Sequence, residues 1–444
     1  MNRETAAPAV EELPGPRATE RVEHHSSFAA PSTYVYEFVW DVTAPAIGPF
    51  CTDADGNVLL DFTGHVGAAP LGYNNPELLD RMETFDMVDP VKIAGQDFYS
   101  TAGDPSDPDF PGPAELMERL VEITPDRMDT VFLSNSGAEA VENGLKICYD
   151  HTAGKYGITF EGAFHGRTLG TLSLNRSKEV YRRRFPELDA IHDAPFCRDS
   201  GCSPATCECG FFAGDTSQLR RILNPETGHV NPDEVAYIIL EPIQGEGGYH
   251  VPSAAFMQEV ADLCAQHDIL LIADEIQSGL GRTGEFWASD GFPIEPDVIC
   301  AAKGARVGAT ISSEDVFPGE KSRLSSTWGA GDLVDSMQGA LTIDVIREQN
   351  LMDNATERGA QAKDALAEAD IPNLIDIRGR GLMLAVEFDT KAQRDDVQEA
   401  AMKRGLLTLG CGHKTLRLLP PLDVREREIR MAVDLLAEAA ESVA

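Results

Sequence analysis

Lysine is scarce in this chain, which has ten lysines among 37 basic residues, against 73 acidic residues. The formal net charge is −36, and the acids are spread along the whole sequence. Phosphate backbones and anionic lipid surfaces are bound by clustered lysine and arginine, so we expect no nucleic-acid partner and no membrane partner. A uniformly acidic, lysine-poor surface stays hydrated when salt screens its self-repulsion, which favours a salt-loving cell over an ordinary acidic bacterial protein.

Long apolar runs and a secretion signal are also missing. The longest apolar runs, such as residues 235–240 and 269–273, fall far short of the roughly 20 residues that span a bilayer. Residues 1–30 contain no basic start followed by an apolar stretch and a cleavage site. The nine cysteines are odd in number and mostly lie in apolar segments, which suits reduced thiols. We therefore expect a soluble, cytoplasmic protein.

The length of 444 residues, with 42% hydrophobic residues, allows one or two full cores and favours a large enzyme over a small binding module. Two apolar runs around an Asp-Gly turn at residues 50–62 predict a hairpin that opens a small domain. We expect four parts in all: a poorly ordered N-terminal arm (1–30), the N-terminal part of the small domain (31–80), a large domain (81–344) and the C-terminal part of the small domain (345–444).

Short apolar runs separated by helical stretches characterise the middle of the chain. They lie at residues 131–133, 157–160, 235–240, 269–273 and 298–301. Runs of this length, with intervals long enough for crossover helices, predict an α/β domain whose mainly parallel sheet is covered on both faces. The helical stretches and short strands after residue 345 predict a smaller α+β domain. Because ligands bind beyond the carboxyl ends of such strands, the residues after each run are candidate site residues.

The first two runs are followed by residues suited to an anion and to a planar ring. Ser136, Gly137 and Ala138 lie in a turn that opens a helix, where free N–H groups and the helix dipole can hold a phosphate. A serine cap that serves only the helix is the alternative. Phe164 could stack on a planar ring and Arg167 could hold a carboxylate, although a packed ring and a surface arginine need no ligand.

The next strand ends carry acids and a lysine. Glu241 and Glu246 lie in a glycine-flanked loop, Asp274 ends a buried run, and Lys303 ends the run after it. A buried acid is costly unless it is paired. A cationic ring nitrogen would pair Asp274, and Lys303 would be well placed for a Schiff base with an aldehyde cofactor. A phosphate cradle, a stacking ring, an acid and a strand-end lysine together indicate pyridoxal 5'-phosphate.

The order of these motifs over residues 45–440 resembles that of class III pyridoxal-phosphate aminotransferases of fold type I. The resemblance rests on Ser136 to Glu139, Phe164 to Arg167, Glu241 to Gly247, Asp274 to Arg282, Pro296 to Val298 with Lys303, Ser326 to Trp328, Arg378 to Gly381 and Leu416 to Pro421. Within the class, residues 322–329, the short loop after Lys303 and residues 409–412 are similar to the lysine 6-aminotransferase and 4-aminobutyrate aminotransferase branches.

The resemblance assigns catalytic roles to the residues that match. Lys303 would bind the cofactor aldehyde and then move the proton between the substrate carbon and the cofactor. Asp274 would keep the pyridine nitrogen protonated, and Gln277 would bond the ring hydroxyl. Phe164 and Ile276 would lie on the two faces of the ring.

The resemblance also implies how the phosphate is held and how the chain assembles. Ser136, Gly137 and Ala138 would hold the phosphate, together with Thr327 of the partner subunit. That shared site implies a homodimer or a dimer of dimers.

A transaminase must bind two unlike substrates in one pocket. Arg167 matches the arginine that holds one substrate carboxylate, and Arg417 matches the one that binds the α-carboxylate of glutamate or 2-oxoglutarate. Glu246 matches the acid that covers Arg417 when the other substrate is bound, although a structural salt bridge would also explain Arg417. The resemblance therefore implies ping-pong transfer from an ω-amino donor, of the 4-aminobutyrate, lysine or ornithine type, to 2-oxoglutarate. A racemase of the same family is the alternative, but it would not need the Glu246–Arg417 pair.

Some segments depart from the family pattern. The loop after Lys303 is several residues shorter than usual and carries Arg306, which could contact substrate or phosphate or face solvent. The segments 64–66 and 72–76 are also unusual, and these changes leave the identity of the donor open.

Four cysteines, Cys197, Cys202, Cys207 and Cys209, lie within thirteen positions. Their spacing differs from the Cys-x₂₋₄-Cys pairs that zinc sites prefer, so a bound metal and a loop of reduced thiols are both open. We expect His165 and His192 to be packing or hydrogen-bonding residues and not metal ligands.

Overall fold

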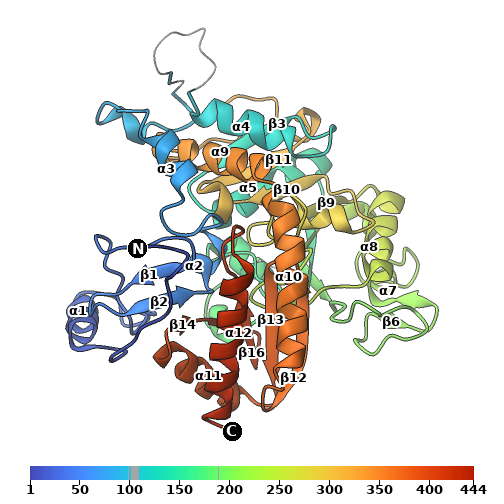
Figure 1. The fold of residues 1–444 in the computed structure, drawn as a ribbon. Helices are drawn as coiled ribbons and strands as arrows, with labels where there is room; N and C mark the ends of the chain where they lie inside the picture. The colour runs from blue at the N-terminus through green and yellow to red at the C-terminus, as the bar shows by residue number, and fades with distance from the viewer. Residues whose placement is uncertain (99, 102–109, 189) are drawn as a thin grey trace. The chain divides into compact units, whose positions relative to one another are not determined.

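The computed structural model describes residues 1–98, 100–101, 110–188 and 190–444 (Figure 1). The chain divides into two compact units. The large unit is Asp80–Met352, and the small unit joins Met1–Leu79 to Asp353–Ala444. The sequence places these boundaries after residues 80 and 344. None of the helices in the described part of the chain is long and apolar enough to cross a membrane.

The large unit is built on a seven-stranded sheet with the order β3-β11-β10-β9-β8-β4-β5. Strand β11 runs antiparallel to both of its neighbours, and the other pairs are parallel. The strands are β3 Thr130–Ser134, β4 Tyr156–Phe160, β5 Ile191–Ala194, β8 Val235–Leu240, β9 Leu270–Asp274, β10 Val298–Ala301 and β11 Gly308–Ser312, with a separate hairpin of β6 Phe212–Ala213 and β7 Thr216–Ser217.

Helices cover this sheet. They are α4 Pro113–Glu122, α5 Gly137–Thr152, α6 Leu169–Leu174, α7 Gln218–Ile222, α8 Ala254–His267 and α9 Leu333–Glu348, with short 3₁₀ turns at η1 Val91–Ile93, η2 Glu179–Tyr181, η3 Pro232–Glu234, η4 Ala288–Gly291, η5 Lys303–Ala305 and η6 Glu314–Val316. Successive side chains of a strand point to opposite faces. Ile238 of β8 packs with Val260 of α8, whereas Ile239 packs with Val141 of α5. The predicted two-sided burial of a mainly parallel sheet is confirmed.

The small unit holds two further sheets, with the orders β1-β2-β14 and β12-β13-β16-β15. Its elements are α1 Pro16–Ser26, β1 Phe50–Thr52, β2 Val58–Asp61, α2 Gly64–Gly67, β12 Leu374–Arg380, β13 Met383–Phe388, α11 Lys391–Lys403, β14 Leu406–Leu407, β15 Leu409–Cys411, β16 Thr415–Leu418 and α12 Glu426–Glu441, while α3 Pro76–Met82 and α10 Leu351–Glu368 run across the unit boundaries. The predicted hairpin is β1–β2, paired with Phe50 opposite Leu60.

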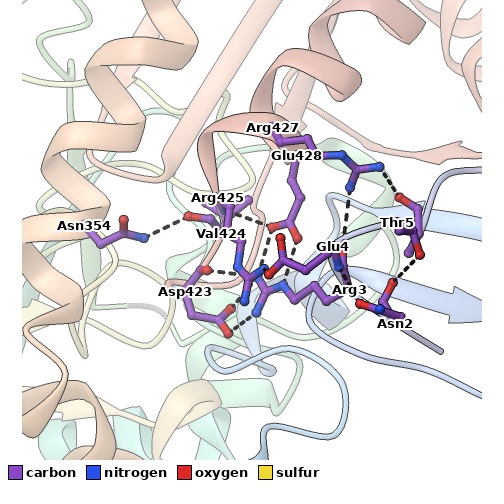
Figure 2. A network of polar contacts seen from close by, with 11 residues as sticks. Asn2, Arg3, Glu4, Thr5, Asn354, Asp423, Val424, Arg425, Arg427 and Glu428 are labelled. Atoms are coloured by element: carbon purple, nitrogen blue, oxygen red, sulfur yellow. Dashed lines mark hydrogen bonds and ion pairs between the residues drawn. The ribbon is translucent and has the colours of Figure 1, made fainter.

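The first residues of the chain differ from the poorly ordered arm expected for residues 1–30. The Arg3 guanidinium donates to Asp423 at 2.6 Å and to Glu428 at 2.8 Å (Figure 2). Burial alone would lower the pKa of Arg3, yet the two carboxylates raise it above its ordinary value. Further along, Ala9 and Val58 exchange two backbone hydrogen bonds of 2.9 Å. Residues near the start of the chain are therefore fixed by partners in both segments of the small unit.

Helix α1 is fixed in the same way. Asp55, in the turn between β1 and β2, accepts hydrogen bonds from the backbone N–H groups of Arg17 and Ala18, both at 2.8 Å. Pro16 occupies the first turn, where its missing N–H costs nothing. Prolines and charges that suggest disorder in the sequence thus become a capped helix, because the cap comes from 37 to 38 residues away.

Candidate functional site

The turn between β3 and α5 forms a capped helix start. Ser136 Oγ accepts from the backbone N–H of Glu139 at 3.2 Å, and the Glu139 carboxylate accepts from the N–H of Asn135 at 2.7 Å. In the structure, Ser136 therefore acts as a helix cap, which is the alternative that the sequence left open. Gly137 lies close to Ile276, since a Cβ at this position would be 2.8 Å from Cδ1 of Ile276. This close approach brings Ile276 against the turn proposed to hold an anion.

Asp274 ends β9 and is only 4% exposed. Its carboxylate accepts from Nδ1 of His165 at 2.7 Å and from the backbone N–H of Ile276 at 3.1 Å. His165 is 2% exposed and thus acts as the hydrogen-bonding histidine that we expected. The sequence did not indicate that its partner would be Asp274, although both residues lie in recognised motifs.

Glu241 follows β8 and orders the loop that carries Phe164. Its two carboxylate oxygens accept from the backbone N–H groups of Phe164 at 3.0 Å and Gly245 at 2.8 Å. Burial raises the pKa of Glu241 to about 7, an effect that nearby His165 reduces and Asp274 increases. Glu241 therefore ties the loops after β4 and β8 together at the carboxyl edge of the sheet.

Arg167 lies across two aromatic rings. Its guanidinium carbon is 5.4 Å from the ring centre of Phe164 and 4.9 Å from that of Tyr181, and the two rings meet edge to face. Among the described residues, no carboxylate forms an ion pair with Arg167, and its side chain is exposed. The rings hold the guanidinium in place and leave its N–H groups available to an anion.

Glu246 has partners that sequence analysis missed. It accepts hydrogen bonds from Nζ of Lys178 and, at 2.9 Å, from the hydroxyl of Tyr181. Burial and Glu246 together raise the pKa of Tyr181. Tyr181 thus links Glu246, predicted to cover Arg417, to Arg167, predicted to hold a substrate carboxylate. No motif marks Lys178 or Tyr181, because both lie in an irregular segment around η2.

Lys303 begins η5 directly after β10 and is partly buried. Strand β10 lies beside β9, with Cys300 paired to Asp274, so Lys303 emerges at the same edge as the acid. Arg306 forms an ion pair of 3.4 Å with Asp335 and is exposed. The sequence leaves open whether Arg306 contacts substrate or phosphate or faces solvent. In the structure it is exposed and contacts Asp335 of α9.

Thr327 lies beside the turn that precedes α5. Its hydroxyl accepts from Nδ2 of Asn135 of the same chain at 2.6 Å. The role expected for Thr327 of the partner subunit stays a prediction.

The small unit carries the other predicted arginine. Arg417 is the third residue of β16, where its register partners are Ala385 on β13 and Leu409 on β15, and it is buried.

The unusual segments of the small unit also meet one another. The Tyr73 hydroxyl donates to Asp61 at 2.8 Å, accepts from Nε1 of Trp40 at 2.8 Å and lies 3.0 Å from Nε2 of His65. His65 and Val66 both have positive φ angles, 51° and 62°, which for the β-branched valine is a strained conformation.

The donor set of the large unit fits pyridoxal phosphate. A helix start with free first-turn N–H groups suits a phosphate, a buried carboxylate suits a protonated ring nitrogen, and a strand-end lysine suits an aldehyde. Residues 37–440 match the family model described as aminotransferase class-III. The chain belongs to the class III aminotransferases. This aminotransferase therefore uses pyridoxal phosphate, as the sequence predicts.

The relatives of this aminotransferase include acetylornithine and lysine aminotransferases. It is 31% identical over 400 residues to the acetylornithine aminotransferase of Methanopyrus kandleri, covering 89% of this chain and 93% of that protein. It is 33% identical over 437 residues to the L-lysine-epsilon aminotransferase of Amycolatopsis lactamdurans, covering 92% and 93%. The solved lysine aminotransferase from M. tuberculosis matches with a TM-score of 0.83 and 30% identity, over 96% of this chain and 99% of that one. The predicted fold type I is confirmed.

Proposed function

We propose that this aminotransferase moves an amino group from an ω-amino donor of the lysine or ornithine type to 2-oxoglutarate by a ping-pong mechanism. The observation that carries this proposal is Arg167, which is fixed by the rings of Phe164 and Tyr181 and pairs with no carboxylate among the described residues. A guanidinium presented in this way suits a substrate carboxylate, which both a diamino acid and a keto acid provide. The names of the relatives support the donor class.

Several residues would hold pyridoxal phosphate in this proposal. The N–H groups after Ser136, at Gly137 and Ala138, would bind the phosphate, and Phe164 and Ile276 would lie against the two ring faces. Gln277 would bond the ring hydroxyl.

Asp274 would hold a proton on the ring nitrogen, and His165 would keep the Asp274 carboxylate in position through its 2.7 Å hydrogen bond. The cofactor supplies an aldehyde that captures the amine and a ring that accepts the electron pair left after deprotonation. With its amine, Lys303 would take the proton from the substrate carbon and then pass it to the cofactor. For this step, its partly buried amine must be neutral while it waits for the proton.

The two substrates would be distinguished by charge. We infer that Arg417 binds the α-carboxylate of 2-oxoglutarate and that Glu246 neutralises it when the donor is present. Glu246 is suited to such a change because Lys178 and Tyr181 offer it alternative partners in the large unit.

We also propose a cytoplasmic homodimer in which Thr327 of the partner subunit joins the phosphate contacts. The nine cysteines support the compartment, since all of them are free thiols and most are buried.

Single half-reactions test the proposal. The purified enzyme is mixed with lysine, ornithine, N-acetylornithine or 4-aminobutyrate in turn, without any keto acid, and the visible band of the lysine-bound cofactor is followed. We expect one of the donors to bleach the band stoichiometrically and 2-oxoglutarate to restore it. If the band persists while an α-amino acid loses its optical activity, the enzyme is a racemase and the proposal is wrong.

Substitution of Arg417 tests whether this residue binds the α-carboxylate of 2-oxoglutarate. Arg417→Ala should raise the KM for 2-oxoglutarate far more than the KM for the donor, because in this proposal the donor's carboxylate binds Arg167. Equal losses for both substrates would contradict the role given to Arg417. Steady-state kinetics with each substrate varied separately provide the measurement.

A further inference from the structure

The four clustered cysteines of the sequence converge in the structure. Cys197 follows β5, and Cys202, Cys207 and Cys209 lie in the loop before β6. The Sγ atoms of Cys202 and Cys209 are 3.8 Å apart, and those of Cys207 and Cys209 are 3.4 Å apart. The sulfurs of Cys197, Cys202 and Cys209 all lie within 4.8 Å of one another. The structure thus gathers three of the sulfurs in one place, with the sulfur of Cys207 next to that of Cys209.

These separations suit a metal ion and not a disulfide. Zinc–sulfur bonds of about 2.3 Å in a tetrahedron place the sulfur atoms about 3.8 Å apart. A disulfide would bring two sulfurs to about 2.05 Å, whereas every cysteine here is free. The sulfurs of Cys197, Cys202 and Cys209 thus lie close enough to share one tetrahedral ion, and Cys207, 3.4 Å from Cys209, is placed to supply the fourth ligand.

The surroundings are those of a closed site. Cys197 and Cys202 are 0% and 3% exposed, and both belong to an apolar cluster that includes Phe196 and Phe211. The backbone N–H of Phe212 points at Sγ of Cys207 at 3.3 Å. Such N–H groups stabilise the charge on metal-bound thiolates. Four sulfur ligands leave no open position, which is typical of structural and not of catalytic zinc.

We propose that Cys197, Cys202, Cys207 and Cys209 bind one zinc ion as thiolates. Each thiol releases its proton to solvent on binding, so four protons leave per ion. Four thiolates select zinc or an iron–sulfur cluster. In a two-iron cluster, two of the cysteine sulfurs would bind each iron ion. Here three cysteine sulfurs, those of Cys197, Cys202 and Cys209, lie within 4.8 Å of one another, which suits a single ion.

The zinc would fix a segment that has little other structure. Residues 195–211 contain no helix or strand and extend beyond β5, the edge strand of the sheet. At its far end the β6–β7 hairpin leads into α7, which lies beside α8 (Figure 1) and is joined to it by Arg220 and Glu259 at 2.8 Å. A zinc ion bound to the cysteines would fix residues 197–209, the part of this segment that follows β5. This role is independent of the amino-transfer reaction.

Metal analysis of protein purified without chelator tests the proposal. We expect about one zinc per chain and no stoichiometric iron or sulfide. A thiol reagent should find four additional reactive cysteines after a strong chelator has removed the ion. Cys202→Ser should lose the zinc, while Cys264→Ser, a buried cysteine of the same apolar cluster outside the four, should keep it.

Several results would overturn the proposal. They are zinc well below stoichiometry, iron with sulfide in place of zinc, or a mass lower by the hydrogens lost to a disulfide. If Cys202→Ser fails to fold, the wild-type protein loaded with Co²⁺ decides: a tetrahedral thiolate site gives intense d–d bands, and weak bands of octahedral cobalt would contradict the site. None of these readouts uses the enzyme's activity, so they do not depend on the proposed reaction.

Discussion

Two sets of acids, one in each unit, have different kinds of partner. In the small unit, Asp423 and Glu428 share the guanidinium of Arg3, which donates to both carboxylates. In the large unit, Glu241, Asp274 and Glu275 are buried at the carboxyl edge of the sheet, and within the described residues no lysine or arginine pairs with any of them. Their partners are an imidazole, a hydroxyl and backbone N–H groups.

This difference separates acids that hold the fold together from acids that cost stability. A buried carboxylate matched by a guanidinium is stable as long as both partners are present. A buried carboxylate without a cation is destabilising, and burial raises the pKa of Glu241 and that of Glu275 to about 7. Such groups concentrate at functional sites, where a ligand can bring the missing charge. Under the proposed function, the cationic ring nitrogen supplies that charge to Asp274.

Lys303→Ala is expected to have the largest effect. Turnover should fall by at least about 10³-fold, because the proton carrier and the point of attachment are lost together. The variant should bind the cofactor only non-covalently, which mass spectrometry after borohydride reduction measures. Lys321→Ala, at an exposed lysine of the same unit, should leave activity unchanged. Retained transaminase activity in Lys303→Ala would refute the assignment.

Arg3→Met should act on stability alone. Removal of the guanidinium leaves buried Glu428 and half-buried Asp423 without a cation, at a cost of about 3 kcal/mol. We expect a clearly lower melting temperature, measured by calorimetry, with kcat unchanged for the folded enzyme. An unchanged melting temperature would show that this network does not stabilise the small unit.

Asp274→Asn should show the opposite pattern. The amide keeps the shape of the carboxyl group and can still accept from His165, so the melting temperature of the apoenzyme should change little. Turnover should fall by about 100-fold, because a neutral amide does not keep the ring nitrogen protonated. Parallel losses of stability and activity would mean that Asp274 is a structural acid like Glu428.

Glu275→Gln should change how stability depends on pH. The folded-state pKa of Glu275 is raised by burial from an ordinary value of 4.5 to about 7. Below pH 4.5 the group is protonated in both states, and between pH 4.5 and 7 the folded state loses stability because only the unfolded state has released its proton. The variant should therefore match wild type in acid and exceed it by about 3 kcal/mol above pH 7. Melting curves across this range give the comparison, and a constant difference would contradict the assigned shift.

Salt should have the smallest effect on the buried acids. Ions screen exposed charges far more than buried ones, so concentrated potassium chloride should raise the melting temperature of the wild type. The difference between wild type and Arg3→Met should meanwhile change by less than about 1 kcal/mol. Full stability of the wild type in dilute buffer would contradict the expectation of a salt-loving protein.

The sequence predicted the strands whose burial is continuous. Residues 235–240 and 298–301 coincide with β8 and β10, because a run of buried apolar residues leaves a signal that needs no partner to be read. Strand β12 was missed, since its half-buried positions and charged residues resemble a loop. The short segment after Lys303 gave no indication that it leads into β11, which pairs with β3 across the sheet.

The candidate site was predictable where chemistry follows a strand end. The sequence places Asp274 and Lys303 at strand ends, where the structure also has them, and it places Ser136, Gly137 and Ala138 at a helix start, which is that of α5. Lys178 and Tyr181 were not found, because their contacts with Glu246 span 65 to 68 residues and depend on how an irregular segment folds back. Arg3 was missed for the same reason, with partners more than 400 residues away.

The discontinuity of the small unit has a consequence for how the chain is made. The large unit is a continuous segment, Asp80–Met352, and can fold as soon as it has left the ribosome. Met1–Leu79 emerges first, yet Arg3 finds its acids only when Asp423 and Glu428 have been translated. During translation the earliest residues must therefore wait for the latest ones, and the small unit is completed last.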